Sequence, residues 1–178
     1  NLLISENIQN RIFIKLGKNF NKMSLTKDNV IIAGCSILDK NVSEFACQNS
    51  LGGLEFLSCI PGSVGGGIRM NSGCFKKEFK DILISIQLVD FKGFVRSIPT
   101  SKINFNYRSI ELPKDLIFLS ATFKGKKKNS EQISKYMNEL NTIKNMAQPT
   151  KIKTSGSTFK NPISQTDQKV WELIRSSV

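Results

Sequence analysis

The sequence predicts an α+β fold, because segments of two different hydrophobic periods follow one another in no regular order. Residues 82–89 place apolar side chains at every second position, as a half-buried strand does. Residues 133–143 instead space their apolar side chains as an amphipathic helix does. The chain has 178 residues, 39% of them hydrophobic, which suffices for the core of one domain or of one domain and a fraction.

The expected strands are alternating or short apolar runs bounded by turn residues. They cover residues 11–16, 30–33, 82–89, 94–98 and 116–123. On the third of these, Ile82, Ile84, Ile86 and Leu88 should share one face. Asp90-Phe-Lys-Gly93 is typical of a turn and should join the third and fourth strands as a hairpin.

Three helices are expected. Asp39 should cap the first, with Gly52-Gly53 as its stop and an apolar face of Val42, Phe45 and Ala46. Ser130 should cap the second, which ends before Pro149 and carries Ile133, Tyr136, Met137, Leu140 and Ile143. Asp167 should begin the third, with Val170, Leu173 and Ile174 facing inward. Residues 124–129 are interpreted as a polar break, and a domain boundary is expected near Gln148-Pro149.

The net charge of +12 suggests nucleic acid, but its make-up argues against that partner. The charge comes from 21 Lys and only 5 Arg, and Arg is the residue that reads bases and grips phosphate with a planar fork. Abundant Lys, Ile and Asn together indicate codon bias in an AT-rich genome. No apolar run approaches the roughly 20 residues of a membrane span. We therefore expect neither a nucleic-acid partner nor a membrane partner.

The cysteines and the missing histidines narrow the chemistry further. The chain contains no His, which excludes His-containing zinc sites, catalytic triads and imidazole general bases. Its four cysteines, Cys35, Cys47, Cys59 and Cys74, show no Cys-x-x-Cys spacing. We interpret most of them as small core residues in a reducing compartment, so we expect a cytoplasmic protein without a metal.

The segment Ile60–Gly73 is the most informative part of the chain. It reads Ile-Pro-Gly-Ser-Val-Gly-Gly-Gly-Ile-Arg-Met-Asn-Ser-Gly, with five glycines in fourteen residues. Glycine is costly to order, and a dense cluster favours close approach of the main chain to a flat or phosphorylated ligand. The pattern matches neither a P-loop nor a Gly-x-Gly-x-x-Gly fingerprint. A tight surface turn is the alternative.

Two further clusters could carry chemistry, although each has an ordinary explanation. In Phe105-Asn-Tyr-Arg-Ser109, Arg108 could hold a carboxylate or phosphate, or could simply stack on Tyr107 at the surface. In Ser155-Gly-Ser-Thr-Phe-Lys-Asn-Pro162, Ser157 offers a hydroxyl on a loop shaped by Gly156 and Pro162, or the stretch is a plain loop.

Taken in order, these motifs resemble a known family. Five motifs, in this order, resemble those of the UDP-N-acetylenolpyruvoylglucosamine reductase family. They are Gly-Leu-Glu-Phe-Leu-x-x-Ile-Pro-Gly-Ser-Val-Gly-Gly (53–66), Arg-Met-Asn-x-Gly (69–73), Tyr-Arg-Ser (107–109), Gln-Pro (148–149) and Gly-Ser-Thr-Phe-Lys-Asn-Pro (156–162). Asn1-Leu-Leu-Ile resembles the tail of that family's Gly-Ser-Asn-Leu-Leu flavin segment, so the resemblance covers nearly the whole chain. Each motif alone is weak, whereas all of them in order are specific.

The resemblance implies a flavoenzyme of peptidoglycan synthesis. It would take hydride from NADPH onto non-covalent FAD and reduce UDP-N-acetylglucosamine enolpyruvate to UDP-N-acetylmuramate. On the family pattern, Arg108 stabilises the developing charge and Ser157 donates the proton. Tyr107, Lys160 and Asn161 would bind the substrate. FAD would contact Asn1, Ile60, Pro61, Gly62, Ser63, Gly65, Gly66, Ile68, Asn71 and Gly73.

The resemblance also implies how the chain is organised. Residues 1–147 would be the later part of a two-subdomain FAD-binding domain of the PCMH type, and residues 148–178 the start of an α+β substrate-binding domain. The 49 residues from Arg108 to Ser157 are too few for the extra Tyr-bearing loop of one family subtype. Gly67 and Ser72 stand where the family commonly has Ala.

Both ends of the sequence look cut relative to the family. The first flavin-contacting segment and the part carrying a catalytic Glu have no counterpart here, so we expect these 178 residues alone to be inactive and only marginally folded. The full-length protein is expected to be a monomer. The rival hypotheses are another FAD-dependent oxidoreductase of the same flavin-binding fold, and an inactive truncated product.

Overall fold

The computed structural model describes residues 4, 6–7, 9–147 and 159–177. It divides into two compact units, one made of residues 12–150 and the other of residues 1–11 with 151–178. The first unit contains the sheet and the hydrophobic core. In the second unit, the described part holds one helix, α4 (Val170–Ser176).

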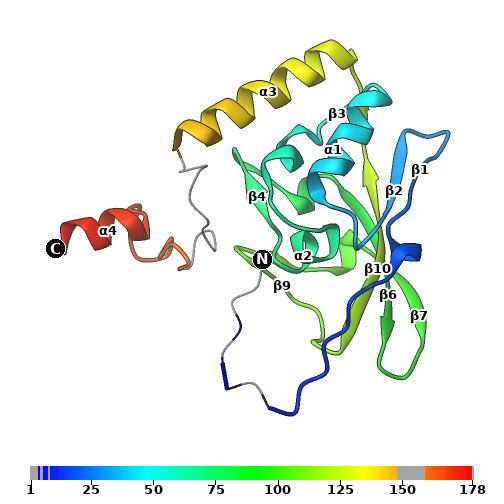
Figure 1. Cartoon of the computed structure of the whole chain (residues 1–178), viewed down its shortest axis with the longest axis horizontal. Helices are drawn as coiled ribbons and strands as arrows, with labels where there is room; N and C mark the ends of the chain where they lie inside the picture. Colours follow the sequence, from blue (N-terminus) through cyan, green and yellow to red (C-terminus); the bar gives the residue numbers. More distant parts are fainter. Residues whose placement is uncertain (1–3, 5, 8, 148–158, 178) are drawn as a thin grey trace. The chain divides into compact units, whose positions relative to one another are not determined.

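A five-stranded antiparallel sheet forms the frame of the larger unit (Figure 1). Its strand order is β1 (Met23–Leu25), β2 (Val30–Gly34), β10 (Leu116–Lys124), β6 (Leu83–Asp90) and β7 (Val95–Pro99). The longest strand, β10, lies at the centre and pairs with both β2 and β6. Two register shifts interrupt the β10–β6 ladder, between Phe118 and Ser120 and between Thr122 and Phe123.

Helical segments and short strand pairs surround this sheet. The helices are α1 (Asp39–Gln48), α2 (Val64–Arg69) and α3 (Ser130–Ala147), and the 3-10 turns are η1 (Lys18–Phe20), η2 (Glu55–Cys59), η3 (Phe79–Asp81) and η4 (Thr100–Lys102). Three small antiparallel pairs complete the unit: β3 (Leu51–Gly52) with β11 (Lys126–Lys127), β4 (Gly73–Cys74) with β5 (Lys77–Glu78), and β8 (Phe105–Asn106) with β9 (Ser109–Ile110).

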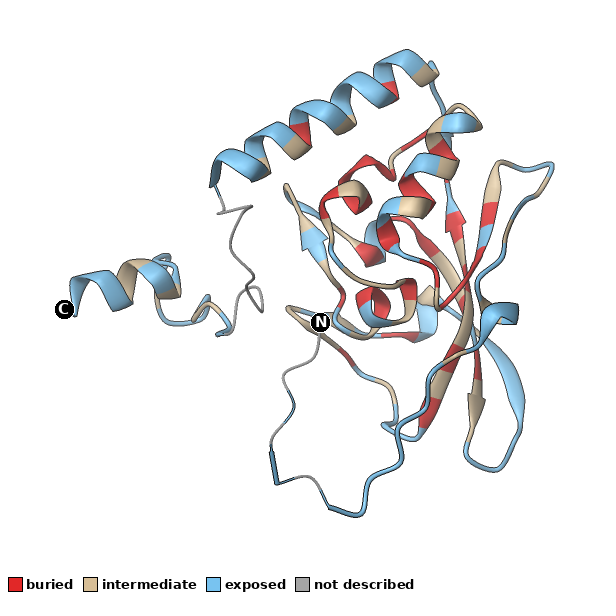
Figure 2. Cartoon of the chain, in the orientation of Figure 1, coloured by how far each residue is buried: buried red, intermediate tan, exposed pale blue. Residues whose placement is uncertain are grey.

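The core lies between the sheet and the layer formed by α1, α2 and η2, where buried residues concentrate in Figure 2. Strand β2 has one buried face: Ile31 and Ala33 are fully buried, whereas Ile32 between them is exposed. Phe79 and Phe123 meet edge to face at 5.9 Å between ring centroids, which links η3 to the central strand. The predicted α+β class is confirmed.

Several predicted elements are confirmed. The strands expected at 30–33, 82–89, 94–98 and 116–123 correspond to β2, β6, β7 and β10. Asp90 Oδ1 accepts hydrogen bonds from the Lys92 and Phe94 main chain, and Gly93 has a φ of +88°, which explains the hairpin turn. The predicted face of β6 is right in part: Ile82, Ile86 and Leu88 are buried, but Ile84 is half-buried and Leu83 is buried instead. The register shift at Leu83 accounts for that change of face.

Other predictions were wrong at the ends of elements. Residues 11–16 form no strand, because no other strand pairs with them, and Ile12 is 90% exposed. Leu38, not Asp39, is the N-cap of α1, and that helix stops at Asn49, before a left-handed Ser50, rather than at the glycines. Residues 124–129, which were predicted to be a polar break, contain β11, and this strand pairs with β3.

The two later helices also begin at residues other than those predicted. Asn129, not Ser130, caps α3, since its Oδ1 accepts hydrogen bonds from Glu131 N and Gln132 N. On that helix Ile133 and Leu140 are buried, Met137 is half-buried, and Tyr136 and Ile143 are exposed. Helix α4 begins at Val170 rather than Asp167. Val170 and Leu173 are half-buried there, but Ile174 is exposed and not inward.

Candidate functional site

The glycine-rich segment is a short helix and not an open loop. Residues 64–69 form α2, and none of its three glycines has a positive φ. Packing requires glycine at position 67, where a Cβ would lie 2.3 Å from the Phe79 ring, and leaves little room at position 65, where a Cβ would lie 3.2 Å from Cys35. The Phe79 ring thus occupies the space that the common family Ala would need at position 67. Gly66 is exposed, and a Cβ there would meet only Ser63 Oγ at 3.7 Å. Packing gives no reason for glycine at position 66.

The main chain at the start of α2 is largely engaged inside the protein. Val64 N donates to Ile37 O and Gly65 N donates to Cys35 O, at 2.9 and 3.0 Å, while Gly62 O accepts from Asp39 N. The N–H groups of Val64 and Gly65 are therefore not available to a ligand. These bonds hold the start of α2 against residues 35–39 and fix where Gly66 is presented.

Arg108 occupies a strained position at the tip of a two-residue hairpin between β8 and β9. Its φ is +54°, in the left-handed region that non-glycine residues seldom adopt. Its guanidinium carbon lies 5.8 Å from the centre of the Tyr107 ring, and both residues are half-buried. The stacking that was the ordinary explanation for Arg108 is therefore present, together with backbone strain that stacking alone does not require.

Asn71 joins this hairpin to the end of α2. Its buried amide donates to Asn106 O at 3.3 Å and to Glu78 Oε2 at 2.9 Å, and its Oδ1 accepts from Lys80 N at 3.1 Å. All of the polar atoms of this side chain are engaged within the protein. Asn71 therefore positions the Arg108 hairpin relative to the glycine segment, and neither its side chain nor its N–H, which donates to Ile68 O, is left for a cofactor.

A cleft of about 490 Å³ opens beside α2. Ser63 and Gly65 line it together with Lys15, Arg69 and the apolar side chain of Phe118, among others. Arg69 is held in place by the carbonyls of Pro113 and Lys114 and lies 5.1 Å from the centre of the Phe118 ring. An apolar wall with two cations at its edge suits a flat ligand that carries negative charge.

The remaining predicted cofactor residues have mixed surroundings. Ile68 is fully buried, so its side chain belongs to the core, and Pro61 is exposed. Ile60 and Gly62 are half-buried beside the start of α2. Gly73 is required by the β4–β5 hairpin, since a Cβ there would lie 2.5 Å from Lys77 O.

The second unit carries the other predicted residues. Asn161 Oδ1 accepts a hydrogen bond from Val170 N at 3.1 Å at the start of α4, and Lys160 is exposed. Asn1, Ser157 and the Gln148-Pro149 boundary lie outside the described residues. Ser157 therefore has no described position beside Arg108.

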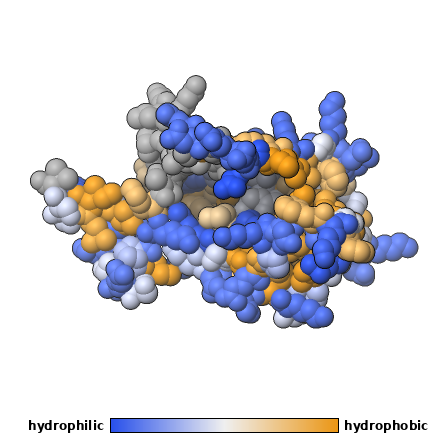
Figure 3. Space-filling model, turned by 90° about the horizontal axis from the view of Figure 1, so that it is seen from below, coloured by the Kyte–Doolittle hydropathy of each residue, from blue (hydrophilic) through white to orange (hydrophobic). Residues whose placement is uncertain are grey.

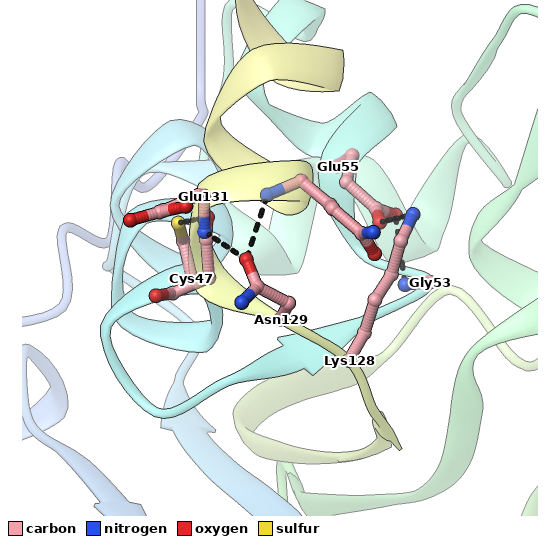
Figure 4. A network of polar contacts seen from close by, with 8 residues as sticks. Cys47, Gly53, Glu55, Lys128, Asn129 and Glu131 are labelled. Atoms are coloured by element: carbon pink, nitrogen blue, oxygen red, sulfur yellow. Dashed lines mark hydrogen bonds and ion pairs between the residues drawn. The ribbon is translucent and has the colours of Figure 1, made fainter.

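Sequence reasoning assigned no role to Glu55, which is 6% exposed at the start of η2. Its carboxylate accepts a hydrogen bond from Gly53 N at 2.7 Å and pairs with Lys128 Nζ at 3.5 Å, as Figure 4 shows. Gly53 has a φ of +101°, a conformation that favours glycine. The Gly53-Leu-Glu55 sequence is therefore the signal from which this turn could have been predicted. The pair anchors η2, and with it the start of the glycine segment, to the strand that leads into α3.

Asp39 is a second residue that sequence reasoning did not connect with the site. It is fully buried, and neither carboxylate oxygen has a hydrogen-bond partner among the described residues. Added Cβ atoms on Gly62 and Gly67 would lie 3.3 and 3.2 Å from Asp39 Oδ2, so the carboxylate lies directly beneath the glycine segment. Burial raises the pKa of Asp39 to about 7. Burial and then the charge of Asp39 raise the pKa of Cys35 to about 12, so that thiol is not a nucleophile at neutral pH.

Comparison with known proteins identifies the fold family. Residues 1–98 match the model of the FAD binding domain, which is more than half of the chain. The chain belongs to the FAD binding domain family. The apolar cleft with its two cations and the unfilled space over Gly66 both fit FAD, so the structure and the family agree.

This FAD binding domain is similar to proteins named UDP-N-acetylenolpyruvoylglucosamine reductase. It is 60% identical over all 178 residues to one from Pelagibacter ubique (strain HTCC1062) and 44% identical over 98% of the chain to one from Rickettsia bellii (strain RML369-C). The crystal structure of the enzyme from Thermus caldophilus matches 92% of the chain with a TM-score of 0.78 and 29% identity. The resemblance drawn from the motifs is confirmed. The chain spans 59%, 57% and 57% of these proteins' lengths, respectively.

Two further observations concern the distribution of hydrophobic residues. On the face drawn in Figure 3, hydrophilic side chains are interrupted by apolar ones. Among the described residues, no helix is long and apolar enough to cross a membrane.

Proposed function

We propose that the full-length protein is an NADPH-dependent, FAD-containing reductase that converts UDP-N-acetylglucosamine enolpyruvate to UDP-N-acetylmuramate. The names of the similar proteins support this proposal, with 60% identity over the whole chain to one of them. The observation that carries it is Arg108, whose guanidinium is borne on a strained hairpin tip that Asn71 ties to the end of the glycine helix.

Arg108 is the charge-stabilising residue in this proposal. When hydride adds to the terminal carbon of the enolpyruvyl double bond, negative charge develops on the adjacent carbon and its carboxylate. A fixed guanidinium placed at that charge lowers the barrier, because it needs no reorganisation as the charge forms. The two-residue turn and the Tyr107 ring hold the guanidinium for this role.

Ser157 is the proton donor in this proposal. A serine hydroxyl is a weak acid in water, but a carbanion-like intermediate is basic enough to take its proton. Tyr107, Lys160 and Asn161 bind the substrate in this proposal. More narrowly, Lys160 contributes the positive charge and Asn161 the amide.

FAD is held by the glycine segment in this proposal. When bound, it supplies hydride transfer between NADPH and the substrate. Gly66 would leave the main chain open to it, and Lys15, Arg69 and Phe118, which line the cleft beside α2, would hold its anionic and flat parts. Ile68 and Asn71 contribute through their main chains in this proposal. The full set of remaining proposed contacts is Asn1, Ile60, Pro61, Gly62, Ser63, Gly65, Ile68, Asn71 and Gly73.

The proposed setting is the cytoplasm, where a buried thiol such as that of Cys35 stays reduced. We propose residues 1–147 as the FAD-binding part and residues 148–178 as the start of the substrate-binding part. The protein is proposed to act as a monomer on a nucleotide-sugar substrate, without nucleic acid and without a metal.

Replacing Arg108 tests the function directly. The full-length Arg108→Lys variant keeps a positive charge but loses the planar fork, so turnover should fall by about 10²–10³-fold while flavin content stays normal. NADPH oxidation coupled to the enolpyruvyl sugar nucleotide measures this. Arg96→Lys, an exposed position on β7, is the matched control and should keep full activity. Near-normal turnover of Arg108→Lys would contradict the proposal.

A further inference from the structure

Two cysteines stand at the two ends of the glycine segment. Cys59 is the last residue of η2, and Cys74 lies in β4, with the fourteen residues 60–73 between them. Strand β4, which holds Cys74, packs against η2, which ends at Cys59, and the neighbouring Cys59 thiol raises the pKa of Cys74. The chain therefore returns to its starting point after passing through the whole segment.

Helix α3 supplies the surroundings of this thiol pair. Cys59 Sγ donates to Asn141 Oδ1 at 3.6 Å, and Asn141 Nδ2 donates to Ser58 Oγ at 3.1 Å. The Lys144 ammonium donates to Cys59 O. Cys59 is 3% exposed, whereas Cys74 is half-buried and can be reached by a small reagent.

We propose that Cys59 and Cys74 form a reversible disulfide that closes the base of the glycine segment when the protein meets a peroxide. The proposal does not depend on the proposed reductase function. It requires only two adjacent thiols, one of them accessible, and an oxidant of the hydroperoxide class.

The chemistry balances in two steps. The Cys74 sulfur attacks one peroxide oxygen, the O–O bond breaks, and water leaves, so that Cys74 becomes a sulfenic acid. The Cys59 sulfur then attacks the Cys74 sulfur, the S–S bond forms, the S–O bond breaks, and a second water leaves. Together the two thiols lose two electrons and two protons, and hydrogen peroxide is reduced to two waters. A dithiol reverses the reaction by thiol–disulfide exchange.

The electrostatics of Cys74 set the rate of this reaction. Burial and the neighbouring Cys59 thiol raise the pKa of Cys74, and the Lys144 ammonium acts in the opposite direction. The thiolate is a minority species at neutral pH, so oxidation is slow. A slow, local reaction fits a reversible cross-link between the two ends of the glycine segment and not a peroxidase.

The consequence is a closed loop around the proposed FAD-contacting residues. A cross-link between residues 59 and 74 limits how far the two ends of the segment separate in the unfolded chain. The oxidised protein should therefore unfold at a temperature roughly 5–10 °C higher than the reduced protein.

Peptide mapping of the unmutated chain tests the proposal. The chain is treated with hydrogen peroxide, alkylated, and cleaved after Glu55 and Arg69, which places Cys47, Cys59 and Cys74 on separate peptides. The expected result is one cross-linked pair that joins the Cys59 and Cys74 peptides, two hydrogens lighter than their sum, and that is lost after treatment with dithiothreitol.

Variants and alternative products sharpen the test. Cys74→Ser should abolish both the cross-link and the rise in unfolding temperature, whereas the control Cys47→Ser should retain both. Because mapping uses the unmutated chain, a Cys59→Ser variant that fails to fold leaves the test intact. Two alkylated thiols at positions 59 and 74 after peroxide, a Cys74 that stops at sulfinic acid, or a cross-link to Cys35 or Cys47 would each overturn the proposal.

Discussion

Asp39 shows how a single residue can oppose stability beneath a binding segment. Its carboxyl group is fully buried beside Gly62 and Gly67, with no hydrogen-bond partner in the described part of the chain. Burying a charge without a partner is unfavourable, so the folded protein retains the proton up to a pH of about 7. In the unfolded chain this carboxyl ionises near its ordinary pKa of 3.8.

This shift predicts a loss of stability as pH rises. The folded state binds more protons than the unfolded state between about pH 4 and pH 7, so the free energy of unfolding falls across that window and stays low above it. The Asp39→Asn variant should lack this slope and be more stable than the unmutated protein at pH 8, by at most about 4 kcal/mol. Urea unfolding at pH 5 and pH 8 measures both effects.

An exposed carboxylate provides the control for this measurement. Asp115→Asn removes an acidic group from the surface of the same unit and should leave the pH dependence close to that of the unmutated protein. If Asp39→Asn is less stable than the unmutated protein at pH 8, then the buried carboxylate has a partner that offsets its burial.

Ser157 is the residue whose predicted role can be separated in time from that of the flavin. In full-length Ser157→Ala, reduction of the flavin by NADPH should proceed at close to the normal rate, because no proton is yet needed from the hydroxyl. Reoxidation by the enolpyruvyl substrate should slow by about 10²-fold or more. Stopped-flow absorbance follows each half-reaction. Equal slowing of the two halves would indicate that Ser157 shapes the site instead.

Among the elements, α2 carries two glycines that look alike in the sequence but differ in environment. Gly67 faces the Phe79 ring, whereas Gly66 faces open space. Gly67→Ala should destabilise the protein by about 1–3 kcal/mol, because the ring must move. Gly66→Ala should be neutral or stabilising by up to about 1 kcal/mol, since alanine favours a helix.

For FAD affinity the expected order is reversed: Gly66→Ala should have the larger effect and Gly67→Ala the smaller. Gly66→Ala should weaken FAD binding by about tenfold or more, which corresponds to ~1.4 kcal/mol. Thermal unfolding and flavin titration of the full-length protein measure the two properties separately. Normal FAD affinity in a stable Gly66→Ala variant would mean that FAD does not approach the exposed side of α2.

At the scale of the whole molecule, the absence of histidine bears on how FAD is held. Covalent flavins are commonly attached through a His side chain, and this chain contains none. Acid or heat denaturation of the full-length protein should therefore release all of the flavin into a yellow supernatant. A yellow pellet under a colourless supernatant would show a covalent link. Apoprotein prepared in the same way and refolded with FAD is the control for recovery.

The sequence by itself determined those features that depend on local chemistry and motif order. The β6–β7 hairpin could be predicted because Asp90 and Gly93 supply its turn within four residues. The family could be predicted because five weak motifs occur in one order, and the comparisons agree with it. Arg108 was predicted as a site residue in the same way, through its neighbours in the chain, and its role stays a prediction.

Only the tertiary structure decided the features that depend on a partner distant in sequence. Residues 11–16 alternate like a strand but stay unpaired, because a strand requires a neighbour that local pattern does not reveal. Gly67 is required by Phe79, and the Asn71 amide is occupied by Glu78, Lys80 and Asn106. Asp39 became a buried carboxyl group instead of a helix cap because the main chain of residues 62–64 pairs with residues 37–39 and covers it. Such long-range contacts set burial, and burial sets both pKa and access to ligand.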